Sequence, residues 1–151
     1  GRGQGEVTHV SGRGLDTSGA PIADAAIGIW QCDANGIYRH PADRRLVHGR
    51  DDGFQGRGRA RSDKDGGYSF RTIRPVAYPG RTPHIHFAIL APGRAPLITQ
   101  MYVAGEPLNQ RDGILNRIDR RQRDSVIVKL QPGDRIEEQA LVGTFDIVLG
   151  S

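Results

Sequence analysis

The chain is poor in cysteine, in aromatic residues and in long apolar runs. It contains one cysteine, Cys32, among 151 residues, so it forms no internal disulfide and offers no cysteine-rich zinc site. We expect Cys32 to be a small buried hydrophobic residue. No stretch of about 18 apolar residues is present, and the sequence therefore predicts no membrane-spanning helix.

A recognisable signal peptide is also missing from the first residues. Its absence predicts a cytoplasmic protein by default. The chain begins at Gly1 rather than at a methionine, so a leader removed before Gly1 would leave the same sequence, and export stays open as the alternative.

Charge of one sign is not concentrated in any part of the chain. The formal net charge is +4, but basic residues are interspersed with acidic ones, as where Arg120 and Arg121 lie between Asp119 and Asp124. A nucleic-acid surface needs a continuous basic stripe with interleaved aromatic side chains, and the sequence shows neither. We therefore predict no nucleic-acid partner, whereas a mildly basic surface suits a small anionic substrate.

Glycine and proline are abundant, with 21 and 9 residues, and this favours a fold with many turns. Short segments that alternate apolar with small or polar residues predict strands at residues 6–11, 25–32, 59–62, 68–73, 84–91, 97–103, 125–130 and 140–149. About eight strands at this spacing predict an all-β fold, an antiparallel β-sandwich. Residues 1–151 show no linker and no internal repeat, so we expect a single domain.

The segments between these strands differ in character. Residues 63–67, Asp-Lys-Asp-Gly-Gly, are typical of a β-hairpin turn, and Pro132 with Gly133 predicts another turn. Residues 38–58 show little periodicity and predict a long loop of the kind that carries active sites. Residues 107–118 predict at most a short helix.

One short segment concentrates residues that bind metals. Tyr78, Arg81, His84 and His86 lie within nine residues. Because side chains alternate along a strand, both imidazoles of a His-x-His pair point to the same face of a sheet. A phenol and a fixed cation beside them indicate one wall of a metal site, although a pair of surface histidines has the same local sequence.

A second tyrosine would define the metal. The candidates are Tyr38, Tyr68 and Tyr102, of which the last two alternate with apolar strand residues in a way typical of the core, while Tyr38 begins the long predicted loop. A tyrosine ligand at neutral pH requires a strongly acidic metal ion to remove its proton. Two phenolates with two imidazoles therefore favour Fe(III) over Zn(II) or Cu(I).

Six segments carry a resemblance to a known family: residues 29–31, 36–40, 54–58, 65–73, 78–87 and 99–102. In this order, with the pattern Tyr…Tyr…Arg-x-x-His-x-His, the chain resembles the intradiol ring-cleavage dioxygenases, the family of catechol and protocatechuate dioxygenases. The resemblance implies that Tyr38, Tyr78, His84 and His86 hold a non-haem Fe(III). It also implies that O2 cleaves a catechol-type diol between its two hydroxylated carbons, which gives a cis,cis-muconate.

The resemblance further assigns roles to individual residues. Tyr78 is the ligand that a bound catechol displaces, and it accepts a substrate proton as it leaves. Arg81 stabilises negative charge on the ring, and Gln100 supports Arg81 or the substrate through hydrogen bonds. Tyr78, Arg81 and Gln100 are therefore the predicted catalytic residues.

The chain also departs from familiar family members, since it is short and shows no counterpart to their helical N-terminal segment or paired unlike chains. The missing substrate walls are expected from residues 38–58 or from another subunit, so a homo-oligomer stays open. Five arginines in or beside this loop either favour an anionic catechol or form a solvated surface: Arg44, Arg45, Arg50, Arg57 and Arg59.

Three rival interpretations remain at this stage. A non-catalytic β-sandwich binding module with structural histidines would show similar alternation, because a fold does not determine a function. A family member that keeps iron but has lost catalysis would keep the same ligands. A divalent-metal hydrolase needs a carboxylate base, and no Asp or Glu lies near the histidine pair in the sequence.

Overall fold

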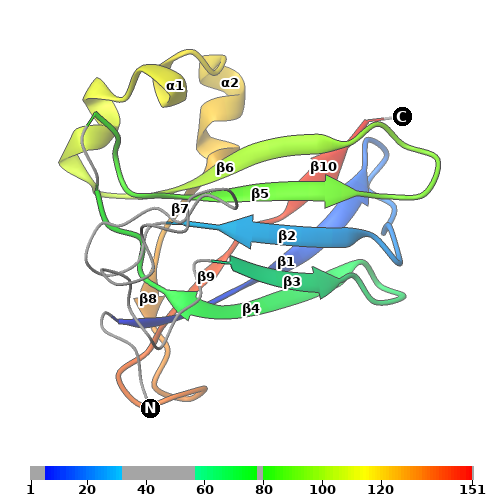
Figure 1. The fold of residues 1–151 in the computed structure, drawn as a ribbon, viewed down its shortest axis with the longest axis horizontal. Helices are drawn as coiled ribbons and strands as arrows, with labels where there is room; N and C mark the ends of the chain where they lie inside the picture. Colours follow the sequence, from blue (N-terminus) through cyan, green and yellow to red (C-terminus); the bar gives the residue numbers. More distant parts are fainter. Residues whose placement is uncertain (1–5, 32–56, 78–79, 151) are drawn as a thin grey trace, which may run out of the picture.

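A computed structural model describes residues 6–31, 57–77 and 80–150. The described chain forms two packed β-sheets with a helical segment beside one of them (Figure 1). The predicted all-β sandwich is confirmed. Cys32 and nearly all of the predicted loop at residues 38–58 lie outside the described residues.

The first sheet is built around the long strand β1 (Val7–Asp16). One edge of β1 pairs antiparallel with β4 (Gly67–Ile73). Its other edge pairs in parallel with β9 (Leu141–Thr144) and then with β10 (Ile147–Leu149), and β8 (Gln131–Pro132) pairs antiparallel with β9.

The second sheet has the order β3-β2-β5-β6-β7. Its strands are β2 (Ala26–Trp30), β3 (Arg57–Arg61), β5 (His84–Leu90), β6 (Leu97–Val103) and β7 (Ile127–Val128). The pair β6–β7 is parallel, whereas the other three pairs are antiparallel. A purely antiparallel sandwich was therefore the wrong prediction, because both sheets are mixed. Parallel pairing needs a long crossover connection, and the chain supplies one between β6 and β7 and a much longer one between β1 and β9.

Two predicted turns also differ from the structure. Residues 63–67 do form a tight turn, in which the N–H of Gly66 donates to the carbonyl of Asp63. The strands on either side join different sheets, since β3 pairs with β2 and β4 pairs with β1. The turn therefore links the two layers and is not a hairpin. Pro132 belongs to β8, and the chain reverses between Gly133 and Ala140, where Gly133 N–H donates to the Ala140 carbonyl.

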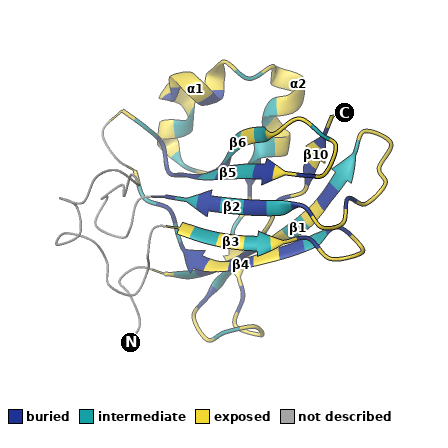
Figure 2. Cartoon of the chain, turned by 45° about the vertical axis from the view of Figure 1, so that its right-hand side comes forward, coloured by how far each residue is buried: buried dark blue, intermediate teal, exposed yellow. Residues whose placement is uncertain are grey.

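The core lies between the two sheets and is formed by alternate residues of each strand. In β5 the inward residues Ile85, Phe87 and Ile89 are at most 2% exposed, so His84 and His86, at the alternate positions, face away from the core. The rings of Phe87 and Phe145 pack edge to face with centroids 4.9 Å apart. The alternation of buried and exposed residues along the strands is visible in Figure 2.

The helical segment between β6 and β7 lies along the β6 side of the sandwich in both views (Figures 1 and 2). It comprises η2 (Pro107–Arg111), α1 (Gly113–Asn116), α2 (Arg120–Arg123) and η3 (Asp124–Val126). The predicted short helix at residues 107–118 corresponds to η2 and α1, whereas α2 was not predicted. None of the helices among the described residues is long and apolar enough to cross a membrane.

A close approach at Gly12 joins β1 to the end of β9. A Cβ atom at Gly12 would overlap the carbonyl of Phe145, whose N–H donates to Ser11. We expect Gly12→Ala to lower the free energy of unfolding by about 3 kcal/mol, because backbone has to move to admit the methyl group. Urea denaturation measures the change.

Gly14→Ala on the same strand is the matched control. The nearest atoms to a Cβ there lie 3.9 Å away, so its midpoint should stay close to that of the wild type. Equal midpoints for the two variants would contradict the close approach at Gly12.

Candidate metal centre

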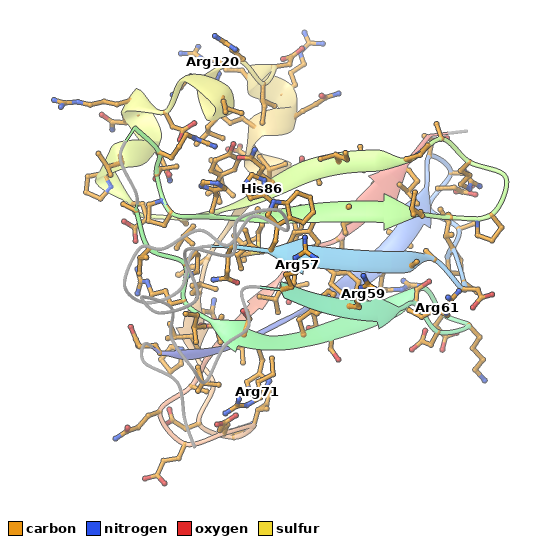
Figure 3. All side chains as sticks on the ribbon, viewed as in Figure 1. Arg57, Arg59, Arg61, Arg71, His86 and Arg120 are labelled. Carbon is orange, nitrogen blue, oxygen red and sulfur yellow. The ribbon has the colours of Figure 1, made fainter. Side chains whose placement is uncertain are left out.

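Strand β5 places His84 and His86 on the outer face of the second sheet, because the alternate residues Ile85, Phe87 and Ile89 face the core. Figure 3 shows His86 on this strand. Their Nε2 atoms lie 3.1 Å apart. Two imidazole nitrogens bound at right angles to one metal ion, each at about 2.1 Å, would be separated by about 3.0 Å. The two rings therefore converge as a pair of neighbouring metal ligands does.

The orientation of His84 is fixed by the backbone next to it. Its Nδ1 lies 2.7 Å from the carbonyl oxygen of Thr82. A proton on Nδ1 satisfies this carbonyl and leaves the lone pair on Nε2, which is the usual arrangement of a metal-binding histidine. Burial lowers the pKa of His84, and this keeps the imidazole neutral at neutral pH.

His86 is held by the neighbouring strand β2. Trp30 is its cross-strand partner, and the two rings stack with centroids 4.9 Å apart and planes within 1°. Burial lowers the pKa of His86 to about 4, and the nearby His84 and Arg81 contribute to the same direction. A neutral imidazole stacked on an indole is restricted in rotation and can bind a metal without first losing a proton.

Arg81 lies beside the histidine pair and is held by several side chains. Its Nη2 donates to Gln100 Oε1 at 2.5 Å and to the Tyr102 hydroxyl at 3.2 Å, and its Nη1 lies 3.5 Å from His84 Nε2. Tyr102 also donates to Gln100 Oε1 at 2.8 Å. The predicted hydrogen bond between Gln100 and Arg81 is therefore present, and strand β6 supplies it as the neighbour of β5.

Asp112 completes this network and was missed by the sequence analysis. Its side chain is fully buried, and its Oδ2 accepts from Arg81 Nε at 2.8 Å and from Thr82 N–H at 2.9 Å. Its Oδ1 caps helix α1 by accepting from Ile114 and Leu115 N–H, each at 3.0 Å. These donors hold the pKa of Asp112 below its usual value despite burial. The one available signal was its position before the helix, which is typical of an N-cap.

No carboxylate lies near the histidine pair in the sequence, but the folded chain brings one close to it. Asp112 approaches the site from 31 residues away. Each of its two oxygens already accepts two hydrogen bonds. The carboxylate is therefore a poor base and an effective anchor for Arg81.

The tyrosine candidates separate into two groups. Tyr38 and Tyr78 lie outside the described residues. Tyr68 is buried in the core, where its hydroxyl donates to the carbonyl of Phe145 and burial raises its pKa, as expected for a core residue. Tyr102 is equally buried, but its hydroxyl belongs to the Arg81 network, which the alternation pattern did not indicate.

The donor set in the described part of the chain restricts which metal fits. Among the described residues, no three His, Cys, Asp or Glu side chains are grouped so that they could hold a metal ion. A metal at the histidine pair therefore needs further donors of another chemical type or from residues 1–5, 32–56, 78–79 or 151. Tyrosine phenolates are donors of such a type, and phenolates together with two neutral imidazoles would fit ferric iron. The predicted tyrosine ligands Tyr38 and Tyr78 lie outside the described residues.

Comparisons with known proteins identify relatives of this chain. The family model described as "Dioxygenase" matches residues 1–151. The protocatechuate 3,4-dioxygenase beta chain of Burkholderia cepacia is 38% identical over 96% of this chain and 65% of that protein. A hydroxyquinol 1,2-dioxygenase of Nocardioides simplex is 36% identical over 73% of this chain and 41% of that protein. The chain thus spans less than two thirds of the length of these relatives.

Solved structures show the same fold. The dioxygenase domain of a dioxygenase and carbohydrate-binding protein fusion from Streptomyces sp. SirexAA-E matches with a TM-score of 0.77 and 33% identity, covering 97% of this chain and 81% of that one. A hydroxyquinol 1,2-dioxygenase from Pseudomonas putida DLL-E4 matches with a TM-score of 0.78 and 25% identity, covering 98% of this chain and 57% of that one. The chain belongs to the intradiol ring-cleavage dioxygenase family.

Proposed function

We propose that this chain cleaves a catechol-type diol with O2 at a non-haem Fe(III), held by Tyr38, Tyr78, His84 and His86. The bond between the two hydroxylated carbons breaks, both atoms of O2 enter the product, and a cis,cis-muconate-type diacid results. The curated relatives are named for protocatechuate, hydroxyquinol and catechol dioxygenases, which supports a diol of this class as the substrate.

The observation that carries the proposal is the convergence of two neutral imidazoles beside a fixed guanidinium. The His84 and His86 Nε2 atoms are 3.1 Å apart, and Arg81 Nη1 is 3.5 Å from the first of them. A structural histidine pair in a binding module has no need of a partly buried cation next to it, since an arginine there lowers the pKa of both rings. A metal site that binds an electron-rich substrate does need such a cation, because the cation stabilises negative charge on the substrate.

Each described residue has a task that follows from its position, and Tyr78 has the role that the family resemblance implies. Ferric iron, when bound, supplies the Lewis acidity that favours a doubly deprotonated diol and makes its ring electron-rich. His84 and His86 present their Nε2 lone pairs in fixed orientations because Thr82 and Trp30 hold the rings. Tyr78 would accept one of the two protons that the diol loses on binding, and solvent would accept the other.

Arg81 stabilises the negative charge that develops on the ring carbon and its oxygen as O2 adds. Its side chain is 14% exposed, and its guanidinium is fixed by Asp112, Gln100 and Tyr102 before substrate arrives. A charge oriented in advance needs no reorganisation during the reaction, and removal of one such group typically costs about 10²–10³ in rate.

The visible absorption spectrum tests the metal and its ligands together. We expect the purified protein, reconstituted with ferric iron, to show a red-brown tyrosinate-to-Fe(III) band. Catechol added under nitrogen should shift this band to longer wavelength, because the diol replaces one tyrosinate on the metal. Admission of O2 should then release a muconate that carries two ¹⁸O atoms when ¹⁸O2 is used.

Each rival interpretation predicts a different combination of absorption spectrum and product. A binding module with structural histidines stays colourless after ferric reconstitution. An inactive family member shows the band and its shift but releases no muconate. A protein that loads zinc and stays colourless would support a hydrolase instead.

A further inference from the structure

The outer face of the second sheet continues from the histidine pair to the far end of the strands. Strand register arranges its outward side chains in rows across β3, β2 and β5. From the metal-centre end outward, the rows are Arg57-Trp30-His86, then Arg59-Gly28-Ala88, then Arg61-Ala26-Leu90. Successive rows are about 7 Å apart because they are two residues apart along the strands. Figure 3 shows the three arginines along β3, with His86 near the Arg57 end.

A groove follows these rows. It has a volume of about 680 Å³, and its floor consists of the small residues Ala26, Gly28 and Ala88. Arg59 and Arg61 form one side, and Leu90, which is 57% exposed, contributes to the other. The groove begins one row beyond the stacked pair of Trp30 and His86, so it opens directly beside the metal centre.

The charge along this groove is not balanced by the sheet. None of the residues of β2, β3, β5 and β6 is acidic. Arg61 pairs with Asp24 at 3.3 Å, but Arg57 and Arg59 have no ion pair within residues 6–31, 57–77 and 80–150. Arg71 on the other sheet, in contrast, is paired with Glu137 at 2.7 Å. Arg59 lines the groove, and Arg57 lies outside its lining, one row nearer the histidine pair. These two exposed cations beside and next to an apolar floor suit an anion joined to an apolar linker.

We propose that the groove binds a carboxylated side chain of the substrate, and this proposal depends on the ring-cleaving function above. The diol ring lies at the histidine pair, the linker crosses Gly28 and Ala88, and the carboxylate meets Arg57 and Arg59. These arginines are two strands away from β5, so their Cα atoms lie about 10–12 Å from that of His86. This separation selects a carboxylate on an extended side chain in preference to an unsubstituted catechol. Arg81 is not available for the task because Asp112, Gln100 and Tyr102 engage it.

The test compares an acid with its uncharged ester. The probes are 3-(3,4-dihydroxyphenyl)propanoate and its methyl ester, which share the diol and the linker. We expect the wild type to cleave the acid with the higher kcat/KM, and the double variant Arg57→Gln/Arg59→Gln to lower the acid-to-ester ratio about tenfold, as two exposed ion pairs allow. Added salt should lower the wild-type ratio in the same direction.

A double variant in α2, Arg120→Gln/Arg121→Gln, is the matched control. It removes the same two charges from exposed positions on the helical side, and its ratio should equal that of the wild type. A ratio that stays unchanged in Arg57→Gln/Arg59→Gln overturns the proposal, and so does an equal fall in both double variants. If another part of the protein or a second copy fills the groove, the ratio stays unchanged in Arg57→Gln/Arg59→Gln.

Binding separates this proposal from the proposed function. Calorimetric titration under nitrogen measures the Kd of the acid and of the ester without turnover. If no catechol is cleaved but the acid still binds more tightly through Arg57 and Arg59, the function fails and the groove stands. If catechols are cleaved but acid and ester bind alike, the groove fails and the function stands.

Discussion

Replacement of His84 with alanine is expected to abolish iron binding and ring cleavage. His84 is 3% exposed, and its Nε2 is one of the two converging nitrogens. Loss of groups that merely orient a ligand typically costs 10–100-fold in metal affinity or activity, so loss of the ligand itself should cost at least about 100-fold. Iron content after dialysis, the tyrosinate band and the rate of muconate release measure the three consequences.

His9→Ala is the control for this substitution. His9 lies on β1 in the other sheet, where its Nε2 is 2.9 Å from Glu137, so its loss should leave iron and colour in place. Circular dichroism of both variants separates loss of metal from loss of fold. Full iron occupancy in folded His84→Ala would show that the histidine pair does not bind the metal and would favour the binding module.

Local sequence predicted the parts of the site that depend on strand periodicity. His84 and His86 fall on one face because they are two residues apart, and Gln100 faces them because β6 is the next strand in the chain and pairs with β5. Neighbouring strands joined by a short turn usually pair. The resemblance then added which residues matter, and the structure places Arg81 and Gln100 in contact.

Asp112 was beyond the reach of the sequence because its role depends on packing. Its capping of α1 follows from its own neighbours, but the cation that it meets lies 31 residues earlier. Nothing in the alternation of β6 or in the composition of residues 107–118 indicates that the helical segment folds back over Arg81. The N-cap was predictable, whereas the ion pair was not.

The prediction of purely antiparallel sheets failed for the same reason. Alternation in residues 6–11 and 140–149 predicts strands but gives no information about partner or direction. The second segment is also interrupted at Phe145, whose N–H donates to Ser11, so that β9 and β10 pair in turn with successive parts of β1. Only the packed sandwich determines that both run parallel to β1.

Asp112→Asn is expected to slow ring cleavage about 10–100-fold without loss of iron. Asparagine keeps an oxygen for the N–H groups of Ile114 and Leu115, but its amide cannot replace Oδ2 as the acceptor for Arg81 Nε and Thr82 N–H. A buried cation that loses its partner typically costs about 3 kcal/mol, so stability should fall as well. Thermal unfolding, iron content, kcat and KM are the measurements.

Asp119→Asn provides the control, because Asp119 caps α2 through Arg121 N–H on an exposed surface and pairs with no cation in the described chain. It should change stability by less than about 0.5 kcal/mol and leave kcat unchanged.

A double-mutant cycle then shows whether Asp112 acts through Arg81. Arg81→Lys keeps the charge but loses the planar fork that bonds Asp112, Gln100 and Tyr102 together. If Asp112 only positions Arg81, the double variant loses no more kcat than the worse single variant, because both changes remove the same interaction. Additive losses would mean that Asp112 influences the rate independently. A loss of stability with unchanged kcat would reduce Asp112 to a helix cap.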